Sequence, residues 1–81
     1  MPDYVLTWVD VSREQYAELD ADTQHLIDLR LADLLEHPDG PGCSEDSLSG
    51  QWVTSDRLGR GLILYSFRQG GPRLVILRLI Y

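Results

Sequence analysis

The residues of this sequence best suited to chemistry are its arginines, because most of them are gathered in one part of the chain. Residues 51–81 hold five arginines against one acidic residue, whereas residues 1–50 hold two arginines against twelve acidic residues, and no lysine occurs. The five are Arg57, Arg60, Arg68, Arg73 and Arg78. The arginine fork matches phosphate and carboxylate groups. The net charge of −6 therefore hides a C-terminal part that should attract anions.

The arginines also have two simpler explanations. A chain that uses only arginine as its cation can reflect the base composition of its genome. Taken singly, Arg57, Arg68, Arg73 or Arg78 can be a solvated residue that protects a sheet face or edge against aggregation. The clustering of five cations against one acid is harder to explain in either way.

The cysteine and the histidines predict neither a metal site nor a redox centre. Cys43 is the only cysteine, so the chain forms no internal disulfide and no cysteine-based zinc site. Its Gly/Pro/Ser-rich surroundings favour an incidental thiol. His25 should be exposed, and His37 suits the dipole at the end of a helix better than a catalytic role. We expect no cofactor and no metal.

Length and composition predict one small cytoplasmic domain covering residues 1–81. The chain has 81 residues, of which 43% are hydrophobic, as in globular proteins. No apolar run approaches the roughly 18 residues that a membrane span requires. The first residues lack the pattern of a secretory signal, and a single cysteine fits a reducing compartment.

The first half of the chain predicts one strand and two helices. Residues 4–9 are apolar on both faces and should form a strand. Ser12 and Gln15 have the spacing of a capping box, which predicts a short helix after Ser12. A second helix should run from Ala21 to Glu36 behind an acidic N-cap, and a proline at 38 should end it. Its inward stripe comprises Ile27, Leu31, Leu34 and Leu35.

The second half predicts a sheet. A loop should cover residues 38–50, followed by strands over residues 51–56, 62–68 and 73–81 with turns at 58–61 and 69–72. Strict alternation in the last strand places Leu74, Ile76, Arg78 and Ile80 on one face. The fold class is α+β in the order β-α-α-β-β-β: a four-stranded, mainly antiparallel sheet with both helices packed on one face.

This order of elements, in about this length, resembles the RelE/ParE superfamily of bacterial toxins across the whole chain. The local likeness lies in Leu-Ser-Gly-Gln-Trp at residues 48–52, in Arg57-Leu58-Gly59, in Tyr65 and in the terminal Arg78-Leu-Ile-Tyr81. The first and last of these strings look most like the YoeB branch. Residues 75–79 also look like the last strand of ParE members.

In RelE and YoeB-like members the resemblance implies ribosome-dependent cleavage of mRNA without a metal. Such cleavage needs a base for the 2′-hydroxyl, an acid for the leaving oxygen and cations for the phosphate. Carried over by position, Arg57 matches a basic residue of the second strand and Tyr81 matches the terminal tyrosine. Glu45 stands near the glutamate base, while Arg60 and Arg78 supply further cations. These five residues form the predicted site.

Two positions depart from that pattern. The family's arginine three residues before the strand tyrosine falls on Leu62, and the histidine before the final tyrosine falls on Ile80. Three functions therefore remain open: a toxin that acts as an mRNA endoribonuclease, a ParE-like toxin that inhibits gyrase by binding it, and a catalytically degenerate member that binds or regulates. Each implies an antitoxin-like partner, with ribosome-bound mRNA or gyrase as the target. The sequence leaves the oligomeric state open.

Overall fold

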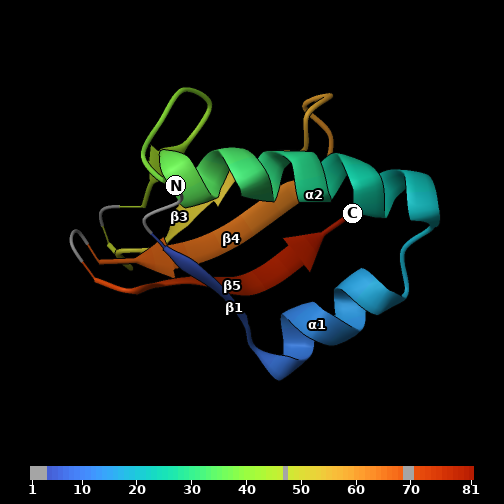
Figure 1. The fold of residues 1–81 in the computed structure, drawn as a ribbon, viewed down its shortest axis with the longest axis horizontal. Coiled ribbons are helices and arrows are strands. Elements are labelled where there is room, and N and C mark those ends of the chain that lie inside the picture. The colour runs from blue at the N-terminus through green and yellow to red at the C-terminus, as the bar shows by residue number, and fades with distance from the viewer. Residues whose placement is uncertain (1–3, 47, 69–70) are drawn as a thin grey trace.

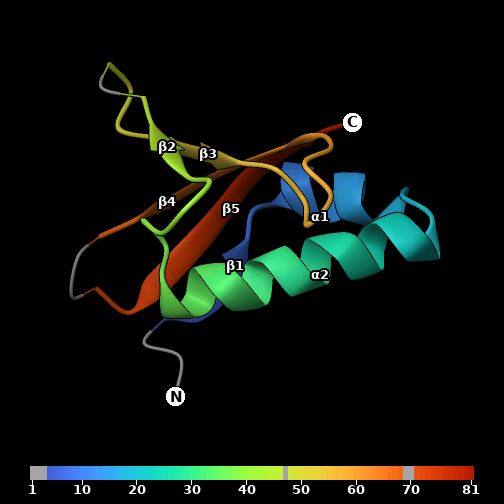
Figure 2. The same cartoon turned by 90° about the horizontal axis from the view of Figure 1, so that it is seen from above.

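A five-stranded sheet with both helices on the same side forms the protein (Figures 1 and 2). The computed structural model describes residues 4–46, 48–68 and 71–81. The elements in chain order are β1 (Val5–Trp8), α1 (Asp10–Ala17), α2 (Ala21–Glu36), β2 (Ser44–Glu45), β3 (Trp52–Thr54), β4 (Leu62–Phe67) and β5 (Arg73–Ile80). The strand order is β1-β5-β4-β3-β2, and among the described residues only the β1–β5 pair is parallel. The predicted fold class is thus confirmed.

The longer helix, α2, has the predicted bounds because both of its ends carry strong local signals. Asp20 is the N-cap, and its carboxylate accepts hydrogen bonds from the Thr23 backbone at 3.4 Å and the Thr23 hydroxyl at 2.5 Å. His37 is the C-cap and precedes Pro38, which disfavours a further helical residue. Local chemistry therefore determines where this helix starts and stops.

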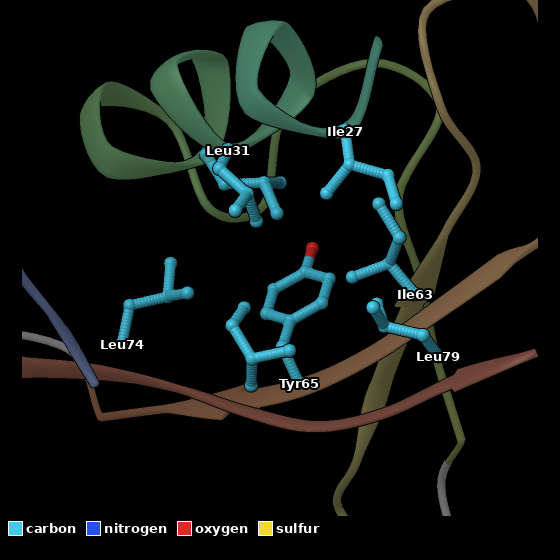
Figure 3. Close-up of a cluster of buried hydrophobic side chains, with 8 residues drawn as sticks. Ile27, Leu31, Ile63, Tyr65, Leu74 and Leu79 are labelled. Atoms are coloured by element: carbon cyan, nitrogen blue, oxygen red, sulfur yellow. The ribbon is translucent and has the colours of Figure 1, made fainter. Parts of the chain in front are cut away.

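The core lies between α2 and the sheet (Figure 3). Its buried members are Ile27, Leu31, Leu34, Ile63, Tyr65, Leu74, Ile76 and Leu79. Tyr65 stands upright in this layer, and its hydroxyl donates a 2.5 Å hydrogen bond to the Pro38 carbonyl at the end of α2. Burial raises the pKa of that phenol. The tyrosine therefore joins the middle of the sheet to the end of the helix.

The shorter helix, α1, begins earlier than predicted and has no capping box. Val9 is its N-cap and makes no side-chain cap bond. The Ser12 hydroxyl donates instead to the carbonyls of Val9 at 3.0 Å and Ile76 at 2.7 Å, and the Gln15 amide oxygen accepts from the Leu79 backbone at 2.8 Å. Beyond β1 the edge of β5 has no strand partner, so its buried backbone groups need side chains. The capping-box prediction was wrong because these two side chains form hydrogen bonds with the β5 backbone instead of capping the helix.

The sheet has one strand more than predicted. Ser44 and Glu45, expected in a loop over residues 38–50, pair antiparallel with Val53 and Trp52 as β2. The exposed edge of β3 accepts this short strand, which local composition does not signal. The predicted turn at residues 58–61 is present. The predicted turn at 69–72 lies partly outside the described residues.

A bulge in β5 changes which face its last residues occupy. The register moves from Tyr65 opposite Ile76 to Leu64 opposite Arg78, so one residue of β5 is extra. As a result Leu79 is buried with Ile76, whereas Arg78 and Ile80 are exposed. The strict alternation expected for this strand is wrong beyond Ile76, because a bulge exchanges the two faces.

Candidate functional site

The candidate site centres on a carboxylate, Asp56, in the turn between β3 and β4. Its side chain is fully buried. One oxygen, Oδ1, accepts hydrogen bonds from the backbone N–H groups of Leu58 and Arg60, each at 2.9 Å. The other, Oδ2, accepts from the Tyr81 hydroxyl at 3.0 Å and lies 3.6 Å from Nε of Arg60. Two backbone groups, a phenol and a guanidinium thus converge on one buried charge.

The hydrogen bonds around Asp56 keep it ionised. Burial alone would raise its pKa, since the charged form loses its hydration. The backbone donors of Arg60 and Leu58, the Tyr81 hydroxyl and the Arg60 charge outweigh burial, and the pKa lies below the ordinary 3.8. At neutral pH the site therefore contains a carboxylate that accepts hydrogen bonds, and its lone pairs are already engaged.

Tyr81 lies over the same turn. A Cβ added to Gly61 would come within 2.5 Å of the Tyr81 ring, and Gly61 has a φ of +64°, so glycine is needed there for both reasons. Burial and the hydrogen bond to Asp56 raise the pKa of Tyr81 to about 12. The hydroxyl is consequently protonated at neutral pH and cannot serve as a base in this arrangement.

Arg57 belongs to a second, adjoining ion pair. Its Nε and Nη2 donate to the two oxygens of Asp33 on α2 at 2.8 and 2.9 Å. Arg30 approaches the same carboxylate at 3.7 Å and donates to the Ser55 carbonyl at 2.9 Å. The Arg57 hydrogen bonds hold the pKa of Asp33 below its usual value. The bidentate pair fastens the β3–β4 turn to α2 and occupies the Arg57 fork.

Sequence reasoning identified Arg57, Arg60 and Tyr81 but missed Asp56 and Asp33. The Asp56 signal is present in the chain: an aspartate at the start of a Gly-containing turn often accepts hydrogen bonds from the backbone two residues on. Asp33 gave no comparable signal, because its partner lies 24 residues away. The position of Arg57 also differs from the prediction, since β3 ends at Thr54 and Arg57 lies in the turn.

Two comparisons with solved structures bear on this arrangement. A chain of the intact E. coli RelBE toxin–antitoxin complex superposes with a TM-score of 0.71 at 13% identity, covering 95% of this chain and 94% of that one. The YoeB/ParE toxin from Agrobacterium tumefaciens gives 0.73 at 20% identity, with 94% and 95% covered. The chain has the RelE/ParE toxin fold. No family model and no curated protein matches it by sequence.

Within the RelE/ParE fold the five predicted site residues do not form one group. Arg60 and Tyr81 meet at Asp56, and Arg57 lies beside them on Asp33. Glu45 is on the edge strand β2, opposite Trp52 at the other end of β3. Arg78 is opposite Leu64 on the exposed side of the sheet. The structure therefore gathers three of the residues and separates the other two from them.

The two positions that depart from the family pattern are direct neighbours. Leu62 and Ile80 are cross-strand partners, and the two residues are 43% and 45% exposed. They lie on the side of the RelE/ParE fold that faces away from α2. An aliphatic pair at this place supplies neither a cation for a phosphate nor a group that transfers a proton.

Three further observations concern possible metal ligands, membrane spans and the cysteine. No three His, Cys, Asp or Glu side chains gather as metal ligands within residues 4–46, 48–68 and 71–81. Neither helix in the described part of the chain is long and apolar enough to cross a membrane. Cys43 is half-buried and lines a hollow with His37 at the end of α2.

Proposed function

We propose that this protein is the toxin of a type II toxin–antitoxin module and acts in the cytoplasm. The observation that supports this is the match of the RelE/ParE fold over nearly the full length of both chains. The RelE/ParE-fold chain of the E. coli complex was solved together with its antitoxin, and we propose an antitoxin partner here as well. The acidic residues 1–50, which include both helices, would suit a basic segment of that antitoxin.

We propose further that the toxin acts by binding a macromolecular target, as ParE-like members do. The Leu62–Ile80 pair is the main support for a binding mode, because it stands where the resemblance places the arginine and histidine used in RNA cleavage. The ion pairs of the arginines also favour a binding mode over RNA cleavage. Arg57 and Arg60 are both neutralised by carboxylates of the chain itself, and Tyr81 is held on Asp56.

A ribosome-dependent mRNA endoribonuclease is the second candidate. Its support is the meeting of a cation, Arg60, and a proton donor, Tyr81, which are 56% and 51% exposed and thus reachable by a phosphate. In such a reaction Arg60 would stabilise the charge on the phosphate, and Tyr81 would donate a proton to the leaving 5′-oxygen. Arg57 could assist only after leaving Asp33.

Induced expression in a bacterial host tests the proposal. We expect growth arrest that co-expression of the antitoxin relieves, with altered plasmid supercoiling and intact mRNA. Normal growth after induction of folded protein would contradict the toxin assignment. Growth arrest accompanied by cleavage of ribosome-bound mRNA would instead favour the second candidate over the binding mode.

The Asp33→Asn variant distinguishes the two modes, because it frees the Arg57 guanidinium from its ion pair with Asp33. A nuclease should bind RNA more tightly after this change, with one more phosphate contact and a salt slope steeper by about 0.7. In the same mode Tyr81→Phe should lower cleavage by about 10²–10⁴-fold with little change in binding. Arg13→Gln, which changes an exposed arginine on α1, is the matched control.

A further inference from the structure

Two exposed arginines stand where β4 ends and β5 begins. Arg68 directly follows β4, and Arg73 is the first residue of β5. The strand register pairs Phe67 with Leu74, so Arg68 and Arg73 are the next positions outward on the two neighbouring strands. This end of the β4–β5 pair lies opposite the end of the sheet at which the C-terminus is found (Figure 1). The two arginines are therefore neighbours in space, well away from the site around Asp56.

Both arginines line one hollow of about 410 Å³. The other described residues that line it are Ser66, Phe67, Gly71, Pro72 and Val75. None of these lining residues is acidic. The volume falls in the range of roughly 300–1,000 Å³ that is usual for sites of small molecules. The hollow thus has room for one small ligand beside two positive charges.

Folding alone does not explain why these two cations stand together. Neither Arg68 nor Arg73 forms an ion pair with another described residue, whereas three other arginines face carboxylates of the chain. Like charges on neighbouring strands destabilise a sheet. Protection of a sheet edge does not account for Arg73 either, because β5 lies between β1 and β4. An anion bound between the two guanidinium groups would remove their repulsion.

The lining of the hollow also offers a neutral donor and an apolar wall. The Ser66 hydroxyl is half-buried and forms no hydrogen bond with any other residue that the structure describes, so it is available to donate to a ligand. Pro72 and Val75 supply the apolar part of the lining. A ligand that matches this hollow therefore has an anionic group and a carbon body.

We propose that the hollow binds a small phosphate monoester. The two arginine forks match a phosphate group that carries close to two negative charges at neutral pH, and each fork can donate two parallel hydrogen bonds. Ser66 donates to a further phosphate oxygen, and Pro72 and Val75 contact the carbon part of the ester. About 25 Å of extended strand separates Arg73 from Tyr81. The site is consequently independent of the proposed toxin function.

The arrangement favours a small ester over single-stranded RNA. Surfaces that bind single strands follow the backbone with a row of cations and offer aromatic rings on which bases stack. Here two cations meet at one place. Phe67 is the aromatic residue of the described lining, and its ring packs against the rings of Tyr4 and Trp52 beside the core. That ring is already covered and is not free to stack on a base.

Calorimetric titration of the full chain with two matched probes tests the proposal. Phenyl phosphate and phenyl sulfate have nearly the same shape, but at pH 8 the first carries two negative charges and the second carries one. We expect phenyl phosphate to bind at least about tenfold more tightly than phenyl sulfate, because each fork then holds a fully charged partner. Inorganic phosphate, which lacks the carbon body, should bind more weakly than phenyl phosphate.

Substitutions assign the binding to the hollow. Arg68→Gln and Arg73→Gln should each weaken phenyl phosphate by about tenfold or more, the effect of losing hydrogen bonds to a charged group. Ser66→Ala should weaken it less. The matched controls are Arg78→Gln, which changes an exposed arginine of the same strand, and Arg13→Gln on α1. Both controls should leave the affinity unchanged.

Four results would overturn the proposal. Equal affinity for the two probes would mean that the hollow does not select a second charge. Unchanged affinity in Arg68→Gln and Arg73→Gln would place the binding elsewhere. Binding of a single-stranded RNA oligonucleotide, weakened equally by Arg73→Gln and Arg78→Gln and without binding of phenyl phosphate, would indicate a general nucleic-acid surface. A lower melting temperature of ligand-free Arg73→Gln would show that this arginine stabilises the fold. Growth arrest is scored separately.

Discussion

The Tyr81 hydroxyl donates a 3.0 Å hydrogen bond to the buried carboxylate of Asp56, so the residue after β5 is tied to the turn between β3 and β4. The same carboxylate accepts two backbone N–H groups of that turn. This hydrogen bond links the end of the β3–β4–β5 meander to its first turn, so protonation of Asp56 or deprotonation of Tyr81 should change the stability of the protein.

Asp56→Asn should lower stability and reduce its dependence on acid. The folded pKa of Asp56 is lowered, so its stabilising contribution is complete above about pH 4 and is lost as the pH falls through the folded pKa. At neutral pH we expect a loss of about 1–3 kcal/mol, the usual effect of disturbing a hydrogen-bonded buried charge. Urea unfolding of wild type and variant between pH 7 and 2 measures the difference; parallel curves would contradict it.

Tyr81→Phe should reduce the loss of stability at high pH. The Tyr81 pKa is raised from 10.0 to about 12, so its contribution is present below pH 10 and disappears as the pH rises toward 12. Tyr16 also has a raised pKa and remains in both proteins, which makes it an internal reference. Ultraviolet titration of tyrosinate should show one late-titrating group fewer in the variant. An unchanged late titration would mean that Tyr81 does not hold its proton in this way.

Gly61→Ala should destabilise the protein, and the effect should depend on Tyr81. The new methyl group would meet the Tyr81 ring at 2.5 Å, at a backbone φ of +64° that alanine adopts at a cost of about 1 kcal/mol. In a Tyr81→Ala background the steric part should vanish and only the backbone part remain. A double-mutant cycle by thermal unfolding measures the coupling. Additive effects would show that the ring does not lie over Gly61.

Leu79→Asn should be far more damaging than Ile80→Asn. The β5 bulge buries Leu79, which is 4% exposed, and leaves Ile80 45% exposed. A polar group in the core loses both its hydration and the aliphatic packing, so we expect about 3 kcal/mol or more for Leu79 and under 1 kcal/mol for Ile80. Strict alternation from Ile76 would give the opposite order. Melting temperatures of the two single variants decide between them.

Leu31→Ala should cost about 2–5 kcal/mol, the range for a buried leucine. The Leu31 side chain is 3% exposed and lies between α2 and the sheet (Figure 3). Since small domains have about 5 kcal/mol to lose, much of this variant should be unfolded at 37 °C. Leu58→Ala, at a 66% exposed turn position, is the control that should melt like wild type.

Local patterns determined α2 and its core stripe in advance. Asp20, His37 and Pro38 mark the helix ends, and Ile27, Leu31 and Leu34 recur at helical spacing; their effects are exerted within a few residues of the chain. The alternation of side chains along β3 and β4 and the order of the elements could likewise be predicted from residues close together in the sequence. These features are specified by residues that are close in sequence and do not depend on the rest of the fold.

The remaining features depend on contacts between distant parts of the chain. Ser12 and Gln15 have the spacing of a cap, but they bond to β5, 64 residues away, because only the folded sheet leaves that edge unpaired. The β5 bulge has no local signal, although it decides which side of the sheet Arg78 occupies. The sequence alone determined that five arginines stand close together along the chain. Only the tertiary structure divided them between internal carboxylates and an open face, because ion pairing depends on distance in space.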